Sequence, residues 1–260
     1  MPTSGGRSGD FIQSLERGLA VINAFSRDHP SQTLSEVATR TGLTRATSRR
    51  VLLTLEDLGY VARSGRSFSL TPKVLDLGYS YLSSLPVIEV AQPSLERLVD
   101  EVHESSSMSV LDRSEIVYVA RVPTTRIMSV TLALGSRLPA YPTSMGRVLL
   151  AGLTDSELDD YIATTELAAL TPHTVTDRRL FRSIVMKVRS DGYSLVDQEL
   201  EEGVRSIAAP IRNRRGQVIA AMNVSCHASR VGVDRMLTGF KPRLLEAAAE
   251  INDRARMLPA

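Results

Sequence analysis

The sequence predicts an α+β protein with two domains, and three observations lead to this fold class. Its 260 residues are enough for two domains of ordinary size. The N-terminal part combines helically spaced apolar residues with one alternating β-hairpin. The remainder contains several short strands separated by helices, the pattern of an antiparallel sheet flanked by helices.

The composition is that of a globular protein with no membrane partner, which we expect in the cytoplasm. Hydrophobic residues make up 43% and charged residues 23%, and no apolar run is long enough for a transmembrane helix. Residues 1–10 are polar and rich in glycine and serine, which predicts a disordered tail rather than a signal peptide. The single cysteine excludes an intramolecular disulfide.

The N-terminal helices form a pattern typical of a helix-turn-helix. Residues 11–25 have helical apolar spacing and end at Asp28-His29-Pro30. The next helix begins at Leu34 and ends at Gly42, a residue suited to a left-handed C-cap. Thr44 is a natural N-cap for a third helix over residues 45–58. Two helices joined by a tight glycine-containing turn predict the motif.

The third helix and the hairpin that follows it predict a winged DNA-binding domain. The hairpin strands at residues 59–63 and 67–70 flank a turn, so that Arg63 and Arg66 lie at its tip. The second half of the third helix is apolar and must face the core, and Ser48 is expected to face inward as well. In a helix-turn-helix, the first half of this helix contacts the edges of the bases. The candidate DNA-binding residues are Arg45, Thr47, Arg49, Arg50, Arg63 and Arg66.

Charge distribution favours the same partner, double-stranded DNA. Residues 1–86 contain 10 basic and 7 acidic side chains, whereas residues 87–260 contain 21 and 22. A local basic excess on a small module is typical of a polyanion-binding surface. A solvated charged face is the alternative, and on charge alone it is the better interpretation.

A linker helix is expected after the wing, because Thr71 can cap it and Pro72 suits its first turn. Its apolar side chains exceed what a lone linker should expose, so we expect them to pack on the N-terminal helix of the same or a second chain. We therefore divide the chain into a tail (1–10), a winged helix-turn-helix domain (11–71), a linker helix (72–86) and a second domain (87–260).

Alternation and helical spacing predict the elements of the second domain. Strands are expected at 107–111, 116–122, 128–134, 195–197, 206–212 and 218–225. Helices are expected at 88–103, 147–151, 156–164, 177–190 and 237–257.

Nothing in the second domain predicts catalysis, a cofactor or a metal site. Phosphate-binding and nucleophile-elbow motifs are missing, since Ser144 lies in Thr-Ser-Met-Gly. Cys226 and His227 are adjacent on a strand and point to opposite faces, so Cys226 is expected to be an inert core thiol. An enzyme acting on a small carboxylic acid through this domain is kept as the alternative function.

A binding pocket is the remaining possibility for the second domain. Ser144 and Met145 begin a helix, where free N–H groups favour an anion. A carboxylate could bind there, with a hydroxyl or keto group of the ligand facing the acidic side chains. A further cation could come from Arg121, Arg126 or Arg137, each of which could equally be a surface residue. The candidates for the pocket itself are Ser144, Met145, Asp197, Glu199, Arg205, Ser206, Asn223 and Ser225.

Five segments resemble the IclR family of transcriptional regulators over nearly the whole chain. The resemblance implies a GAF-like effector domain, ligand-responsive DNA binding, and dimers or tetramers on palindromic operators. It places the effector pocket on Ser144, Met145, Asp197, Ser206, Asn223 and Ser225, although some members have cysteine at Ser206 and serine at Asn223. The segments are residues 14–21, 34–38, 50–61, 144–151 and 203–210.

Within that family, residues 121–123 and 138–144 are most similar to the PcaR/PcaU/PobR group. This group controls catabolism of protocatechuate, β-ketoadipate and 4-hydroxybenzoate. The resemblance therefore implies an effector that is a small carboxylate, either an aromatic acid or a product of its ring cleavage.

Overall fold

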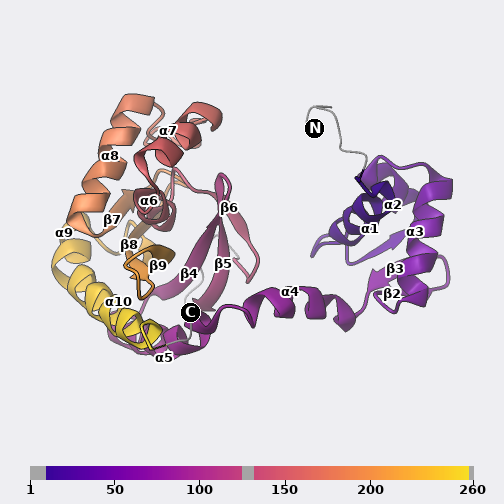
Figure 1. The fold of residues 1–260 in the computed structure, drawn as a ribbon, viewed down its shortest axis with the longest axis horizontal. Coiled ribbons are helices and arrows are strands. Elements are labelled where there is room, and N and C mark those ends of the chain that lie inside the picture. Colours follow the sequence, from indigo (N-terminus) through magenta and orange to yellow (C-terminus); the bar gives the residue numbers. More distant parts are fainter. Residues whose placement is uncertain (1–9, 125–131, 258–260) are drawn as a thin grey trace. The chain divides into compact units, whose positions relative to one another are not determined.

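The chain forms two compact units, divided between Ser84 and Leu85 (Figure 1). The computed structural model describes residues 10–124 and 132–257. In this described part no helix is both long and apolar enough to cross a membrane.

The first unit is a helix-turn-helix with a three-stranded wing. Its sheet has the order β1-β3-β2, and both pairings are antiparallel. Val21, Val37, Leu52 and Phe68 form the centre of its core. The elements are α1 (Gln13–Asn23), β1 (Ser31–Thr33), α2 (Leu34–Thr41), α3 (Arg45–Asp57), β2 (Val61–Ser64), β3 (Ser67–Leu70), the 3₁₀ turn η1 (Pro72–Val74) and α4 (Leu75–Leu82).

The second unit is a six-stranded antiparallel sheet with helices on both faces. The strand order is β6-β5-β4-β9-β8-β7. Its helices are α5 (Pro86–Val102), α6 (Ser144–Ala151), α7 (Asp155–Thr164), α8 (Arg178–Asp191), α9 (Val233–Arg235), the π-helical turn η2 (Met236–Phe240) and α10 (Lys241–Ala255). Its strands are β4 (Ser105–Asp112), β5 (Glu115–Val122), β6 (Arg137–Pro139), β7 (Ser194–Asp197), β8 (Val204–Arg212) and β9 (Val218–His227).

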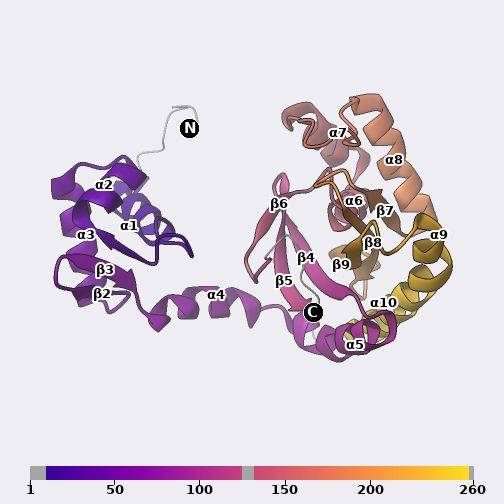
Figure 2. The same cartoon turned by 180° about the vertical axis from the view of Figure 1, so that it is seen from behind.

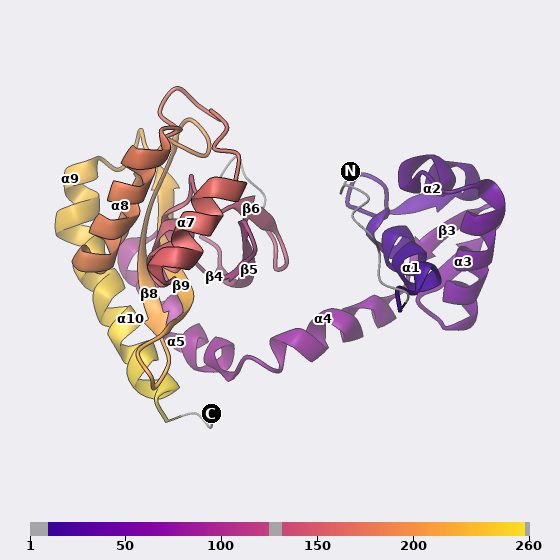
Figure 3. The same ribbon diagram turned by 45° about the horizontal axis from the view of Figure 1, so that its top comes forward.

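Two layers of helices cover this sheet. Helices α5 and α10 lie side by side and pack on β4, β5, β8 and β9 (Figure 2). Helix α6 packs against β4, β8 and β9 from the opposite face, and α8 packs on α6. Helix α7 lies beside α8 (Figure 3). A hydrophobic core lies on the α6 side, around Phe181 and Met145. The predicted α+β class is thus confirmed.

Two short strands differ from the sequence prediction. The strand expected at 128–134 lies partly outside the described residues, and residues 132–134 are not in a strand. The edge strand is β6 instead, where Glu115 pairs with Pro139. Pro139 argues against a strand in the sequence, because proline lacks an N–H and is tolerated only where a strand has a free edge. Strand β1 was not predicted either, since its three residues are polar.

Candidate functional sites

The turn between α2 and α3 is built from local hydrogen bonds. The Thr33 side chain and Glu36 form a capping box at the start of α2. Gly42 ends that helix at φ 68°, a conformation that glycine adopts without a Cβ penalty. Thr44 then caps α3, because its hydroxyl accepts the Thr47 N–H at 3.2 Å. These bonds fix where α3 begins and therefore which of its side chains are exposed.

Helix α3 presents arginines on one face and the core on the other. Ser48, Leu52 and Leu55 are buried. Arg45, Arg49 and Arg50 are exposed and have no ion-pair partner among the described residues. At 100° per residue, Arg45 and Arg49 lie within about 40° of each other around the helix axis. They form one basic surface at the N-terminal half of α3.

Thr47 faces a different direction from Arg45 and Arg49. Together with Arg50, it lines a groove between α1 and α3. Its hydroxyl accepts a hydrogen bond from the Thr44 hydroxyl at 2.9 Å. Thr47 thus lies at the margin of the basic surface of α3.

The two wing arginines also differ. Arg66 is exposed in the turn between β2 and β3, next to Gly65 at φ 60°. Arg63 lies within β2, and its Nε is 3.4 Å from the Glu56 carboxylate of α3. Arg66 is therefore the freer cation of the two.

The second unit contains a cavity of about 40 Å³ on the α6 side of the sheet. About 10–15 Å³ admits one water, so this volume suits a few waters rather than an aromatic ring. The polar and apolar walls come from α6, β5, β7, β8 and β9. The lining residues are Tyr118, Leu132, Leu138, Pro142, Thr143, Ser144, Met145, Val196, Leu200, Val204, Ser206, Asn223 and Ser225.

The structure brings five of the six expected effector residues together at this cavity. They are Ser144, Met145, Ser206, Asn223 and Ser225. The apolar lining residues of the cavity and Tyr118 were not predicted from the sequence. Only their place in the folded sheet identifies them, because isolated apolar residues in a strand are ordinary core residues.

The first turn of α6 points hydrogen-bonding groups at the cavity. Thr143 caps the helix by accepting the Gly146 N–H at 3.1 Å. The N–H groups of Ser144 and Met145 have no backbone acceptor among the described residues. The Ser144 hydroxyl donates to the Ser206 hydroxyl at 2.8 Å, which joins α6 to β8.

Gly146 allows α6 to approach the chain closely. A Cβ at this position would lie 2.0 Å from the carbonyl oxygen of Ala140. No side chain fits there without displacing backbone, so the glycine sets the distance between α6 and the segment before it.

One buried polar atom of the cavity lacks a hydrogen-bond partner among the described residues. The Asn223 Oδ1 is buried and makes no hydrogen bond among the described residues. Burial raises the pKa of Tyr118 to about 12, although the positive charge of Arg121 opposes the rise. A buried polar group without a partner is costly, which is the usual sign that a ligand or water supplies it.

Asp197 does not line the cavity, although it was expected there. Val196 points into the cavity, and successive residues of a strand point to opposite faces. The Asp197 carboxylate instead accepts two hydrogen bonds from Arg205, each 2.8 Å long. The two side chains neutralise each other away from the pocket.

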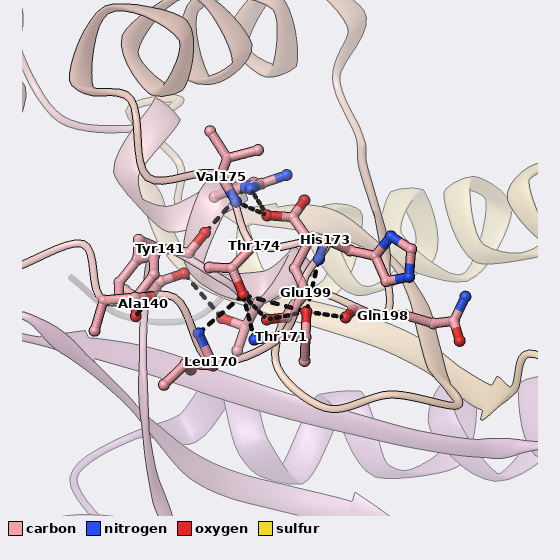
Figure 4. A network of polar contacts seen from close by, with 12 residues as sticks. Ala140, Tyr141, Leu170, Thr171, His173, Thr174, Val175, Gln198 and Glu199 are labelled. Atoms are coloured by element: carbon pink, nitrogen blue, oxygen red, sulfur yellow. Dashed lines mark hydrogen bonds and ion pairs between the residues drawn. The ribbon is translucent and has the colours of Figure 1, made fainter.

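Glu199 likewise has a structural partner. It is buried and forms an ion pair with Arg147 of α6 at 2.6 Å. It also accepts the Val175 N–H at 3.0 Å, and its own carbonyl accepts the Thr174 hydroxyl (Figure 4). The network binds the loop after β7 to α6 and to the segment before α8.

The three arginines proposed as extra cations have different surroundings. Arg137 is paired with Asp112 at 2.6 Å and with Glu115 at 2.7 Å. Arg126 lies outside the described residues. Arg121 is half-buried and has no ion pair among the described residues.

Cys226 has the environment of a core residue. It is fully buried, and its thiol contacts the Met236 sulfur at 3.7 Å. Burial raises the pKa of the thiol to about 12, so it is not a ready nucleophile. His227 is exposed on the other face of β9, and no cluster of possible metal ligands exists among the described residues.

Comparison with known proteins gives matches to both units. Residues 14–65 match the IclR helix-turn-helix domain, and residues 79–253 match the C-terminal domain of bacterial transcriptional regulator IclR. The Pca regulon regulatory protein of Pseudomonas putida is 46% identical over 243 residues, 93% of this chain and 84% of that protein.

Two further proteins are similar over most of their length. The p-hydroxybenzoate hydroxylase transcriptional activator of Acinetobacter baylyi is 37% identical over 252 residues, 95% of this chain and 93% of that protein. An IclR homolog from Microbacterium hydrocarbonoxydans, solved in complex with 4-hydroxybenzoate, is 26% identical with a TM-score of 0.82. That match covers 92% of this chain and 98% of the other.

The buried ion pair of α6 yields a stability prediction. Glu199→Gln leaves the Arg147 guanidinium buried without its counter-charge, which should lower the free energy of unfolding by about 3–5 kcal/mol. Asp159→Asn, which breaks the exposed pair with Arg182, is the matched control and should leave the unfolding curve unchanged. Urea unfolding of the three proteins checks this. Equal stability of Glu199→Gln and the parent would contradict a structural role for the pair.

Proposed function

The chain belongs to the IclR family of bacterial transcriptional regulators, and we propose from this premise that it controls genes for aromatic-acid catabolism in response to a small carboxylate. The relatives named above support the choice of pathway, since one regulates the Pca regulon and another activates p-hydroxybenzoate hydroxylase. A regulator of this kind acts on DNA in the cytoplasm.

The basic surface of α3 is the observation behind the DNA-binding proposal. Arginine can pair bidentately with guanine in the major groove, and exposed Arg45 and Arg49 lie together on the half of the helix that enters it. Arg50 borders the groove between α1 and α3 and would contribute at the margin of this surface. Arg66 at the wing tip would contact phosphate, whereas Arg63 shares its charge with Glu56. Thr47 would contribute at the margin of this surface.

The unpaired polar groups of the cavity are the observation behind the effector proposal. Ser144, Met145, Ser206, Asn223 and Ser225 would bind a hydroxylated carboxylic acid, while the apolar wall would contact its carbon skeleton. The similar protein from Microbacterium binds 4-hydroxybenzoate, which has this chemistry. With a volume of about 40 Å³, the cavity must widen to admit such an acid. Ligand binding would therefore change the shape of the unit.

A catalytic role for this domain has less support. Its cysteine is buried with a raised pKa, and its buried carboxylates Glu104 and Glu199 are paired with arginines. We infer that the domain binds its ligand without converting it, and incubation with 4-hydroxybenzoate should return the acid unchanged.

We further propose that the protein is at least a dimer. The groove between α1 and α3 has a volume of about 440 Å³ and is bordered by Leu15 and Leu58, which are 60% and 53% exposed. Helix α4 buries none of its residues, and Leu75 and Tyr79 are more than 70% exposed. A second copy could cover these apolar surfaces, and paired recognition helices would read two half-sites.

The DNA-binding proposal predicts a selective loss in one variant. Arg49→Ala should weaken binding to the DNA upstream of the protein's own gene by about 1–3 kcal/mol in a gel-shift titration, because a base contact is removed. Arg214→Ala removes the same charge from an exposed turn of the second unit and should have no such effect. Unchanged affinity and sequence preference in Arg49→Ala would show that α3 is not the recognition helix.

The effector proposal predicts a ligand-dependent stabilisation. 4-Hydroxybenzoate should raise the thermal midpoint of the parent protein, because it binds only the folded state. Asn223→Leu should abolish the shift while leaving DNA binding without ligand intact, and Gln217→Leu in the exposed β8–β9 turn should keep it. If 4-hydroxybenzoate raises the thermal midpoint of Asn223→Leu as much as that of the parent, the effector does not bind at this cavity.

The dimer proposal predicts a change in mass. Light scattering at micromolar concentration should give at least twice the monomer mass for the parent. Leu75→Glu places a charge among the exposed apolar side chains of α4 and should favour the monomer. Ser80 lies on another face of the helix, so Ser80→Glu should leave the mass unchanged. A parent that is monomeric at this concentration would exclude the proposal.

A further inference from the structure

Arg121 is an unusual arginine of the second unit. The other arginines with little exposure are bound, Arg147 to Glu199 and Arg205 to Asp197. Arg121 is half-buried in β5 and has neither an ion pair nor a side-chain hydrogen bond among the described residues. A guanidinium kept partly from water without a counter-charge is available to an anion.

The strand register places Arg121 on the same sheet face as the cavity. Arg121 pairs with Ser107 of β4, and Ser107 pairs with Asn223 of β9. Residues directly opposite each other in antiparallel strands point to the same face. Asn223 lines the cavity, so the three side chains form one row that leads from the cavity toward β5.

Two contacts confirm which face this is. Ser109 lies two residues beyond Ser107 in β4, and its hydroxyl bonds the Met145 sulfur of α6 at 3.3 Å. Ser109 pairs with Tyr118, which lines the cavity. The positive charge of Arg121 acts to lower the pKa of Tyr118. Arg121 and Ser107 do not line the cavity as it stands.

The strand spacing gives the separation of Arg121 from the cavity wall. Strands lie roughly 4.8 Å apart, so the Cα atoms of Arg121 and Asn223 are separated by roughly 10 Å. Ser206 lies on β8, one strand beyond β9. It pairs with Ser225 rather than with Asn223, so it lies two residues off this row, where its hydroxyl meets that of Ser144. A ligand that widens the cavity along this row would meet a cation at one end and neutral hydroxyls at the other.

We propose that Arg121 binds the carboxylate of the effector and thereby selects acids over neutral analogues. The effector hydroxyl then faces Ser206 and Ser144, with the ring between. This orientation reverses the one expected from the helix N-terminus alone, because a guanidinium binds a carboxylate bidentately and more strongly than two N–H groups do. The inference rests on the proposed effector site and names its charge partner.

Calorimetry with matched ligands and variants tests the assignment. The parent should bind 4-hydroxybenzoate at least tenfold more tightly than 4-hydroxybenzamide. Arg121→Gln should weaken 4-hydroxybenzoate and benzoate alike, by about 10- to 100-fold, as expected for a charged hydrogen bond. Ser206→Ala should weaken 4-hydroxybenzoate but not benzoate, which lacks the hydroxyl. Arg214→Gln, an exposed control, should bind as the parent does.

The outcomes separate this inference from the proposed function. If the parent binds neither acid, the effector proposal fails and the inference fails with it. If the parent binds 4-hydroxybenzoate but Arg121→Gln binds it equally well, the effector site stands and the assignment of Arg121 is wrong. The assignment of Arg121 is also wrong if the parent binds 4-hydroxybenzoate and 4-hydroxybenzamide equally tightly. This comparison uses the parent protein alone, so it does not depend on whether a variant folds.

Discussion

The buried ion pair between Arg147 and Glu199 is the interaction that holds together the walls of the cavity beside α6. Arg147 belongs to the helix that presents Ser144, and Glu199 lies one residue before Leu200 on the facing wall. Removing both charges from water is expensive and is offset only by excellent geometry. The Tyr141 carbonyl and the Val175 N–H complete the hydrogen bonding, so the two walls are held at a set spacing.

Close to this pair, the cavity retains polar groups that stability alone would not favour. The Asn223 amide oxygen is buried without a partner, and the neighbouring hydroxyls bond mainly to each other. Such groups reduce the stability of the empty protein and strengthen binding of a ligand that satisfies them. The difference in free energy between empty and filled states is what a sensor needs to shift an equilibrium.

The two units use arginine in opposite ways. In the first unit Arg45, Arg49 and Arg50 have no counter-charge among the described residues, which suits a surface that binds a polyanion. In the second unit most arginines with little exposure are held by carboxylates or carbonyls, as Arg147 and Arg205 are. Arg121 departs from this rule, and this departure is the observation behind its proposed role at the effector carboxylate.

The sequence by itself determined the helices and the start of α3, because caps and periodicity are local properties, whereas the short strands β1 and β6 did not follow from it. Thr44 and Gly42 delimit α3 whatever lies around it, and Ser48 is buried as its spacing predicts. The register and pleat of the sheet were decided only in the tertiary structure, since pairing depends on distant strands. That register excludes Asp197 from the cavity, although the sequence had named it for the pocket. It also aligns Arg121 with Asn223, although Arg121 had been expected only as a further cation or a surface residue.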